Sequence, residues 1–394
     1  MAGPLDGIRV LDLSTVISGP FATMLLADQG ADVIKIESGS TPDHARGAGH
    51  GENQFTATFL NNNRNKRSLT LDLKTPEGKE VLLKLAATAD VFVQNFRPGV
   101  VERLGVDEDS IRAVKPDIIY ASISGFGEKG PWSHKPVYDP IVQALSGLTT
   151  IQAGSDEARP RLVRTIVPDK LTGMTMAQAI SSALVARERT GAGQHVRVSM
   201  LDAVIAFLWA SDMGGQTFVG REVSVQRAAT FIDLIYETST SYISVSAMTN
   251  RQWQALCDAV GHPEWKDDER FRTPALRDLN ANERLELTQE ALLARPAEEW
   301  LDILEEAGVP CAPVLTRRQM IDHPQIQASE LIIETDHPVA GRLRQTRPAA
   351  RFSGTVPEIR RGAPALGEHN EELLAEIGIS GEAVEQLRNK GVIK

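Results

Sequence analysis

The chain has little cysteine and no long apolar run. Its two cysteines, Cys257 and Cys311, are too few for a disulfide framework and lack C-x-x-C spacing, so we expect two core thiols in a reducing compartment. The most conspicuous apolar run, from Ala203 to Ala210, falls far short of the roughly twenty residues that span a bilayer. The N-terminal residues carry no cationic stretch followed by an apolar core, so we expect no secretory signal. These absences predict a soluble, cytoplasmic protein without a membrane partner.

Positive charge is also scarce. The 394 residues hold 42 Lys and Arg against 52 Asp and Glu, which gives a formal net charge of -10. Nucleic-acid binders carry a basic excess, so this balance argues against a nucleic-acid partner. Any polyanionic ligand therefore needs a local basic patch, which could hold several phosphate groups. Cations gather near the ends of predicted elements at Arg64, Lys66, Arg67, Lys74, Arg97 and Arg103.

Signatures of metal, dinucleotide and serine-nucleophile chemistry are missing. No two of the 8 histidines stand at helical i, i+4 spacing with an acidic partner, and the chain has no G-x-S-x-G motif. The run Gly125–Gly130 matches G-x-G-x-x-G, but Pro131 and Trp132 follow it, so we predict a turn there. The loop that should carry such glycines, residues 14–20, has a single one. Carboxylates are left as the candidate nucleophiles or bases.

The N-terminal third alternates between strand and helix patterns. A doubly wound α/β layer with a parallel sheet is the expected result. The predicted strands are Ile8–Leu13, Asp32–Glu37, Asp90–Gln94 and Asp117–Ile123. The predicted helices are Phe21–Asp28, one that starts at Thr75–Pro76, and Glu108–Val114.

The rest of the chain divides differently. We predict one long helix rich in small residues over Asp169–Arg189 and a linker at 210–224, where the glycines Gly214, Gly215 and Gly220 break the pattern. The large domain would then begin with residues 1–209, and a smaller α+β domain would cover 225–318. A tail over 319–394 ends in two short helices, near Glu371–Ile377 and Gly381–Asn389.

Asp169 follows Pro168 and begins the long helix. Aspartate is among the preferred N-cap residues, so a capping role is the simplest interpretation. A carboxylate at a helix N-terminus is also held ionised by the helix dipole, and the free N–H groups there can stabilise negative charge that develops beside it.

Seven ordered segments together resemble one family. They are Gly19–Glu37, Asn63–Ser68, Leu71–Lys74, Asp90–Gly99, Ile119–Gly127, Thr190–Gln194 and Leu366–Asn370. In this order they resemble the class III coenzyme A transferases, the CaiB/BaiF-like family of formyl-CoA transferase and carnitine CoA-transferase. The resemblance runs from about residue 5 to the end of the chain.

The resemblance implies a Rossmann-like large domain that includes the returning C-terminal tail, a small domain, and a ring-shaped chain in an interlocked homodimer. It also implies a ping-pong transfer of coenzyme A from an acyl-CoA donor to a small carboxylic acid acceptor, with no metal or prosthetic group. Asp169 matches the position of the family's nucleophilic aspartate. Its carboxylate would attack the thioester, form a mixed anhydride, and then carry coenzyme A as an aspartyl thioester.

The coenzyme A contacts implied by the resemblance fall into two loops and a few cations. They are Thr15, Val16, Ile17, Ser18, Lys74, Asn95, Phe96, Arg97 and Arg103, with Lys135 one position out of register. Phe96 would stack on the adenine ring while the cations meet phosphates. Backbone N–H groups of residues 14–19, or of a mobile glycine loop, would stabilise the oxyanion. The resemblance also places the pair Tyr138–Asp139 in the active site, as catalytic candidates beside Asp169.

Two departures from the family and two alternatives stay open. Ile17 stands where the formyl-CoA and oxalate enzymes have glutamine, and residues 226–231 lack the family's glycine run, which acts as a lid; formyl-CoA:oxalate transfer is therefore not expected. A related α-methylacyl-CoA racemase uses a His-Asp pair where this chain has Tyr138–Asp139, and tyrosine is a poor proton acceptor at neutral pH. The other alternative is a catalytically silent coenzyme A-binding protein.

Overall fold

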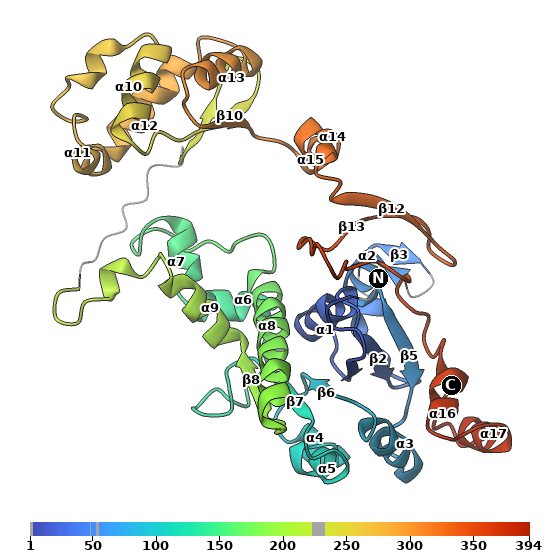
Figure 1. The fold of residues 1–394 in the computed structure, drawn as a ribbon. Coiled ribbons are helices and arrows are strands. Elements are labelled where there is room, and N and C mark those ends of the chain that lie inside the picture. Colours follow the sequence, from blue (N-terminus) through green and yellow to red (C-terminus); the bar gives the residue numbers. More distant parts are fainter. Residues whose placement is uncertain (1–2, 48, 53–54, 223–232) are drawn as a thin grey trace. The chain divides into compact units, whose positions relative to one another are not determined.

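The computed structural model describes residues 3–47, 49–52, 55–222 and 233–394, which pack into two compact units (Figure 1). The first unit runs to Thr149, resumes over Arg161–Glu222, and includes Glu330–Lys394. The second holds Thr150–Pro160 and the described residues from 233 to Ser329. The domain ranges 1–209, 225–318 and 319–394, with a linker at 210–224, stay a prediction.

A six-stranded sheet forms the centre of the first unit (Figure 1). Its strands are β1 (Arg9–Asp12), β2 (Asp32–Glu37), β5 (Lys66–Thr70), β6 (Val91–Gln94), β7 (Ile119–Ser124) and β8 (His195–Ser199). They lie in the order β5-β2-β1-β6-β7-β8, and every neighbouring pair is parallel. The prediction of a parallel α/β layer is confirmed. The strand order switches between β1 and β6: β2 and β5 extend the sheet on one side of β1, and β6, β7 and β8 extend it on the other. In open α/β sheets the loops after the two strands at such a switch point lead to opposite faces and leave a crevice between them.

Helices cover both faces of the sheet because successive strand residues point to opposite sides. One apolar core lies between the sheet and α1 (Ser18–Asp28) and α8 (Val167–Thr190). The other lies between the sheet and α3 (Pro76–Ala86), α5 (Glu108–Val114), α16 (Asn370–Glu376) and α17 (Glu382–Asn389). Leu11 and Phe92 face the second core, whereas their neighbours Val10 and Val91 face the first.

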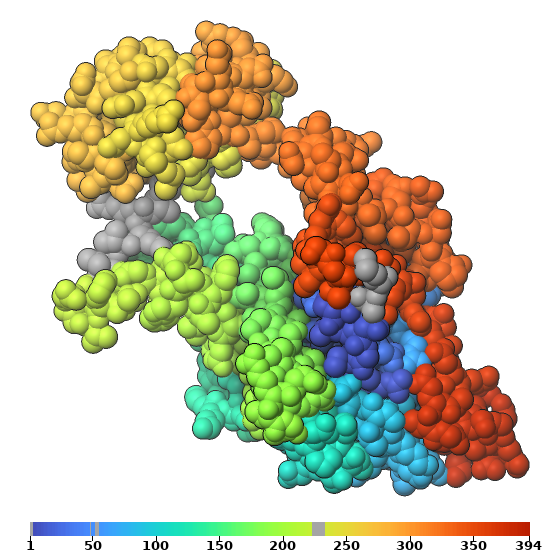
Figure 2. All heavy atoms as spheres, in the orientation of Figure 1, coloured from blue at the N-terminus to red at the C-terminus, as the bar shows by residue number. Residues whose placement is uncertain are grey.

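The C-terminal tail returns to the outer strand of the sheet. The Thr70 N–H of β5 donates to Asn370 Oδ1 at 2.9 Å, and the Asp72 N–H donates to the Val392 carbonyl at 2.8 Å. The red C-terminal residues accordingly lie against the blue residues near β5 (Figure 2). Residues some 300 positions apart in sequence thus close the edge of the sheet.

Shorter elements complete the first unit. The helices are α2 (Ala57–Asn63), α4 (Val100–Leu104), α6 (Asp139–Leu145), α7 (Leu148–Ala153, which runs into the second unit) and α9 (Met200–Trp209), with 3-10 turns at His44–Arg46 and Gly214–Gln216. Two antiparallel pairs join β3 (Gly51–Glu52) to β4 (Phe55–Thr56), and β12 (Ile332–His337) to β13 (Gly341–Thr346).

The second unit is a small α+β body with its own core. Its antiparallel sheet has the order β11 (Cys311–Pro313), β10 (Tyr242–Val245), β9 (Ile235–Glu237). It packs with α10 (Asn250–Ala259), α11 (Pro274–Leu279), α12 (Ala281–Leu292), α13 (Ala297–Glu306) and a 3-10 turn at Pro263–Lys266. Two short helices, α14 (Arg317–Asp322) and α15 (Pro324–Ala328), follow β11 in the chain and contact each other. Trp253 and Trp300 are buried in the core of this unit.

Several predicted boundaries need correction. The first helix begins at Ser18 instead of Phe21, so residues 18–20 belong to α1 and not to the preceding loop. Strands β5 and β8 and the hairpin of β12 and β13 were not predicted from the sequence. The turn over Gly125–Gly130 is confirmed, because no helix or strand covers these described residues. The helix start at Thr75–Pro76 is also confirmed, since the Thr75 side chain caps α3.

Candidate active site

The loops after β1 and β6, at the switch point of the strand order, are joined by the side-chain amide of Asn95. The Thr15 N–H, in the loop after β1, donates to Asn95 Oδ1 at 2.9 Å. Asn95 Nδ2, in the loop after β6, donates back to the Thr15 carbonyl at 2.8 Å. This reciprocal pair fixes the spacing of the two loops, and open α/β sheets bind their ligands at this place.

A cavity of about 380 Å³ opens between these loops and the start of α8; we call it the Asp169 cavity. Most residues that the sequence proposed for the site line it. These are Thr15, Val16, Ser18, Asn95, Phe96, Arg97, Lys135, Tyr138 and Asp169. Ile17 and Asp139 are not among the lining residues: Ile17 is the N-cap of α1, and Asp139 is buried at the start of α6.

A second cavity of about 360 Å³ lies on the other side of Phe96 and Thr15, which line both; we call it the Lys74 cavity. Lys74 and Arg103 line it and complete the predicted set. In the described part of the chain, Lys74, Arg97 and Arg103 are exposed and form no ion pair. Three cations around two adjoining cavities are therefore free to meet an anionic ligand.

The other predicted cations have a different role. Arg64, Lys66 and Arg67 are buried in or next to β5, and each is paired with a carboxylate of the same unit. The partners are Asp28 at 2.6 Å, Asp12 at 2.9 Å and Asp32 at 2.6 Å, respectively. The expectation that these three hold phosphate groups is wrong, because their charges are already neutralised inside the fold.

Asp169 lies in the first turn of α8 and close to the N-terminus of α1. It is the third residue of α8, whose N-cap is Ile166, so the N-cap interpretation is wrong. The Asp169 carboxylate accepts hydrogen bonds from the backbone N–H and the hydroxyl of Ser18, the first residue of α1. The helices can approach because Gly173 has no side chain: a Cβ there would lie 2.8 Å from the Ser18 carbonyl oxygen.

The Asp169 carboxyl is nevertheless more basic than an ordinary aspartate. Burial raises its pKa, the neighbouring Asp139 carboxylate raises it further, and the Ser18 hydrogen bonds oppose them only in part, which leaves the pKa at about 6. The Ser18 donors lower this pKa, as a position near a helix N-terminus predicts, but burial and Asp139 outweigh them; with a pKa of about 6 the carboxyl is still mainly ionised at neutral pH. A half-buried carboxylate with a pKa near neutrality is typical of a nucleophile or a base.

Asp139 supports the start of α8. Its Oδ2 accepts a long hydrogen bond of 3.4 Å from the Asp169 N–H, and its Oδ1 accepts one of 2.6 Å from Gln143 Nε2. Burial raises the pKa of Asp139 as well. Tyr138 precedes it as an exposed residue on the cavity wall, and the ammonium of Lys135 lies 3.4 Å from the centre of the Trp132 ring.

The backbone donors of the first loop are mostly in use. The Thr15 N–H donates to Asn95 and the Val16 N–H donates to Asp43 Oδ1 at 3.0 Å, while the Ser14 N–H donates to Asp12 at 3.0 Å. These three groups cannot serve an oxyanion, contrary to the expectation for residues 14–16. In the first turn of α1, the Ser18 N–H donates to the Asp169 carboxylate instead.

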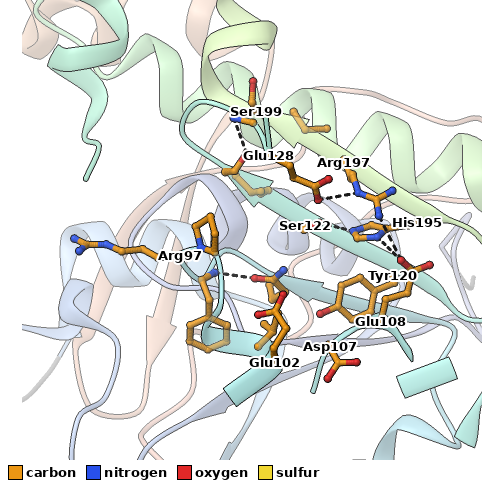
Figure 3. A pocket seen from close by; sticks show the side chains of 18 of the residues that line it. Arg97, Glu102, Asp107, Glu108, Tyr120, Ser122, Glu128, His195, Arg197 and Ser199 are labelled. Carbon is orange, nitrogen blue, oxygen red and sulfur yellow. Dashed lines mark hydrogen bonds and ion pairs between the residues drawn. The ribbon is translucent and has the colours of Figure 1, made fainter. Parts of the chain in front are cut away.

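A third cavity, of about 820 Å³, adjoins the Asp169 cavity, since Phe96, Arg97 and Ser124 line both (Figure 3). A hydrogen-bonded chain of side chains lines it: Ser122 Oγ lies 2.5 Å from His195 Nε2, and His195 Nδ1 lies 2.6 Å from Glu108 Oε2. No sequence motif had indicated it, because the three residues come from β7, β8 and α5.

The hydrogen-bonded row of Ser122, His195 and Glu108 has the connectivity of a catalytic triad, but its surroundings differ from those of one. Ser122 is an inner residue of β7 and pairs with Gln94 of β6 on one side and Arg197 of β8 on the other. The backbone N–H groups beside it are therefore committed to the sheet and cannot form an oxyanion hole. Burial also lowers the pKa of His195 despite the contact with Glu108. We interpret these three hydrogen-bonded side chains as a structural link between α5 and the sheet.

Fold and site together describe a doubly wound α/β protein whose described residues place a half-buried carboxylate and unpaired cations at the switch point of its parallel sheet. The family model that matches the sequence, over residues 5–370, is that of CoA-transferase family III. The chain belongs to this family.

Curated relatives agree over nearly the whole chain. Succinyl-CoA:glutarate CoA-transferase of Mus musculus is 33% identical over 99% of this chain and 90% of its own length. Acetyl-CoA:oxalate CoA-transferase of Acetobacter aceti is 35% identical over 95% of this chain and 96% of its own. The crystal structure of a CaiB/BaiF family protein from Brucella suis matches with a TM-score of 0.83 and 31% identity, over 96% of this chain and 100% of that one.

None of the helices in the described residues is long and apolar enough to cross a membrane. The same residues hold no group of three or more His, Cys, Asp or Glu side chains placed to bind a metal ion. The sequence position of the glycine lid, residues 226–231, lies outside the described residues.

Proposed function

We propose that the chain transfers coenzyme A from an acyl-CoA to a carboxylic acid by ping-pong exchange on Asp169. The observation that carries the proposal is the position of this carboxylate. It lies in a cavity at the switch point of the sheet, beside a cavity with free cations, and it accepts hydrogen bonds from the first residue of α1.

The reaction begins when an Asp169 carboxylate oxygen attacks the thioester carbonyl carbon of the donor. The carbon–sulfur bond breaks, coenzyme A leaves as a thiolate, and a mixed anhydride remains on the enzyme. The thiolate then attacks the Asp169 carbonyl carbon, which releases the donor acid and leaves an aspartyl-CoA thioester. An acceptor carboxylate reverses both steps, so the new acyl-CoA departs and the Asp169 carboxylate is restored.

Helix α1 stabilises the charge that develops in these steps. When Asp169 is acylated, its second oxygen becomes an oxyanion in each tetrahedral intermediate at its carbonyl carbon. The Ser18 N–H and hydroxyl already donate to this carboxylate, and the Gly19 N–H lies in the same helical turn. Preorganised donors of this kind can contribute several kcal/mol each, about 3 by mutagenesis in other enzymes.

Coenzyme A binding is assigned to the two adjoining cavities. Its adenine and phosphate groups would take the Lys74 cavity, with Lys74 and Arg103 against phosphates and Phe96 against the adenine ring. Its pantetheine arm would pass Phe96 and Arg97 and place the thioester in the Asp169 cavity. Cation contacts to phosphate and aromatic stacking are the usual means of holding such a ligand.

The acids exchanged are proposed to be short dicarboxylic acids. The named relatives act on succinyl-CoA, glutarate and oxalate. The Asp169 cavity, at about 380 Å³, has room for the end of the pantetheine arm and a short acyl group. An exposed cation on its wall, Lys135, is placed to attract the second carboxylate of such an acid as it enters.

Assembly and compartment are part of the same proposal. We propose an interlocked homodimer of ring-shaped chains, as the family resemblance implies. The cytoplasm is the proposed compartment, because its acyl-CoA pools supply the donor and its redox poise keeps the free thiols of Cys257 and Cys311 reduced.

A second candidate is the racemisation of an α-methylacyl-CoA. The observation in its favour is the pair of carboxyls, Asp139 and Asp169, whose pKa values are both raised beside one cavity. Proton abstraction would then exchange the hydrogen on the α-carbon with solvent. Deuterium uptake at that carbon in heavy water without acyl exchange would favour it over transfer.

The test of the proposed transfer is a trapped intermediate. The enzyme is incubated with a panel of acyl-CoAs, including succinyl-CoA and glutaryl-CoA, without an acceptor, and its intact mass is measured. We expect an adduct with the mass of coenzyme A that hydroxylamine removes and that Asp169→Ala does not form. No adduct across the panel, or an adduct that persists in Asp169→Ala, would refute the mechanism.

A further inference from the structure

The loop between β1 and α1 has an unusual backbone. Val16 has a φ of 71°, in the left-handed region that glycine favours and β-branched residues avoid. Such a conformation costs on the order of 1–3 kcal/mol and persists only where surrounding contacts enforce it. Val16 lies on the wall of the Asp169 cavity, two residues before Ser18.

The contact that enforces it comes from a buried carboxylate. Asp43 Oδ1 accepts hydrogen bonds from the Val16 N–H at 3.0 Å and from the Ala45 N–H at 2.9 Å. Asp43 Oδ2 accepts one from the Lys35 ammonium at 2.8 Å, and the same ammonium donates to the Ser14 carbonyl at 3.0 Å. A single ion pair thus holds the loop at two points.

This ion pair is buried without exposure of either side chain. Burial would raise the pKa of Asp43, but Lys35 and the backbone donors outweigh it and lower that pKa. Asp43 is therefore ionised and serves only as an acceptor, so its orientation toward the Val16 N–H is fixed. Its backbone N–H is tied as well, because it donates to Glu37 Oε1 at 3.1 Å.

Asp43 also lines the Lys74 cavity, so it lies between the proposed nucleotide subsite and the loop. The loop leads directly into α1, whose first residue donates to Asp169. A shift of Val16 would therefore turn the first turn of α1 away from the carboxylate.

We propose that Asp43, held by Lys35, is a positioning residue for the reaction: it keeps Val16 in its left-handed conformation and thereby aims the N-terminus of α1 at Asp169. The inference rests on the proposed function, since it assigns Asp43 a role in the acylation of Asp169. Asp43 touches neither the reacting atoms nor Asp169.

Two double variants isolate this role. Lys35→Met/Asp43→Asn replaces the ion pair by neutral side chains of similar size and keeps a carbonyl oxygen for the Val16 N–H. Lys35→Met/Asp43→Leu makes the same replacement without any acceptor. Neither leaves a buried charge unpaired, and such replacements of buried pairs are often tolerated. The control is Asp28→Leu/Arg64→Met, which removes an equally buried pair at the far end of α1.

The measurement is the rate of formation of the hydroxylamine-labile coenzyme A adduct at saturating acyl-CoA, with the affinity for free coenzyme A measured alongside. We expect the leucine variant to react about 10- to 100-fold more slowly than the asparagine variant, since small misplacements cost about that much. Both should bind coenzyme A within about threefold of each other, and the control should react within about threefold of wild type.

Two results would overturn the inference. Equal rates in the leucine and asparagine variants would show that the Val16 acceptor is irrelevant. An equal loss of rate in the leucine variant and the control would assign the effect to stability alone. A wild-type enzyme that forms no adduct would instead refute the proposed function, and the positioning role with it.

Discussion

The first unit contains two groups of buried carboxylates that are treated in opposite ways. Beneath the first loop, Asp12, Glu37 and Asp43 are each bonded to a cation at 2.7–2.9 Å. At the Asp169 cavity, Asp139 and Asp169 lie beside each other, and neither forms an ion pair within the described chain. The first group holds the sheet and its loops together, and the second is available for chemistry.

The pKa of each carboxyl depends on the charges beside it. Burial alone would raise the pKa of Asp12, but the ammonium groups of Lys66 and Lys35 lower it to about 2. Burial also raises the pKa of Asp169, and its nearest charge is another carboxylate, so the pKa reaches about 6. The fully buried Asp12 is a structural anion held by two ammonium groups, whereas the half-buried Asp169 is the more basic carboxylate. Among the described residues no cation forms an ion pair with Asp169, which leaves its carboxylate available for chemistry.

The largest effect should come from removal of the unpaired carboxylate. Asp169→Ala should lower the rate of coenzyme A transfer by on the order of 10³-fold or more, because no other group can form the covalent intermediate. The measurement is the steady-state rate with succinyl-CoA and glutarate. A variant that kept more than a tenth of the wild-type rate would place the nucleophile elsewhere.

Loss of a paired cation should damage stability instead of chemistry. Lys66→Met removes the partner of Asp12, and neither side chain of this pair is exposed. Breaking such a pair from one side costs about 3–5 kcal/mol, and the nearby Lys35 should keep the loss at the lower end. Urea denaturation measures it. A loss below about 1 kcal/mol would mean that the pair contributes little to folding.

Neutralising Asp169 should stabilise the protein. Its pKa in the folded state, about 6, lies above the ordinary value of 3.8, so ionisation is disfavoured by folding. The penalty is fully present above pH 6, shrinks as the pH falls from 6 to 3.8, and vanishes only below 3.8, where the group is protonated in both states. Asp169→Asn should therefore gain about 2–3 kcal/mol at pH 7.5 and less than about 1 kcal/mol at pH 4. Equal stability of the two proteins at pH 7.5 would contradict this.

The smallest effect should come from the neighbouring carboxylate. Asp139→Asn removes one of the charges that raise the pKa of Asp169, although burial, the larger cause, remains. Adduct formation requires ionised Asp169, so it should fall as the pH drops through about 6 in wild type. In the variant this fall should move to lower pH. Single-turnover rates between pH 4.5 and 8 measure the shift, and an unchanged profile would show that the two carboxylates are not coupled.

The sequence was informative where local pattern decides the structure. The parallel α/β layer follows from alternating strands and helices. The site loops, at Thr15 and Asn95, lie at the ends of predicted strands, and most of the residues that the resemblance indicated do line two adjoining cavities.

The sequence was uninformative where distant residues decide it. The run around Arg64 and Lys66 has the composition of a solvated surface, yet it is buried because Asp28 and Asp12, 36 and 54 positions away, neutralise it. Its interior strand, β5, was missed for the same reason. Asp43 gave no local signal either, since its role depends on the backbone of Val16.

The contrast between the two groups of carboxylates is tested most directly by residue-resolved titration. Aspartate labelled with ¹³C at the carboxyl carbon, assigned with Asp169→Asn and Asp12→Asn, reports the protonation of each group by NMR. We predict that Asp169 titrates near pH 6 and that Asp12 stays ionised down to about pH 2. An Asp169 carboxyl that titrates at or below pH 4 would contradict it.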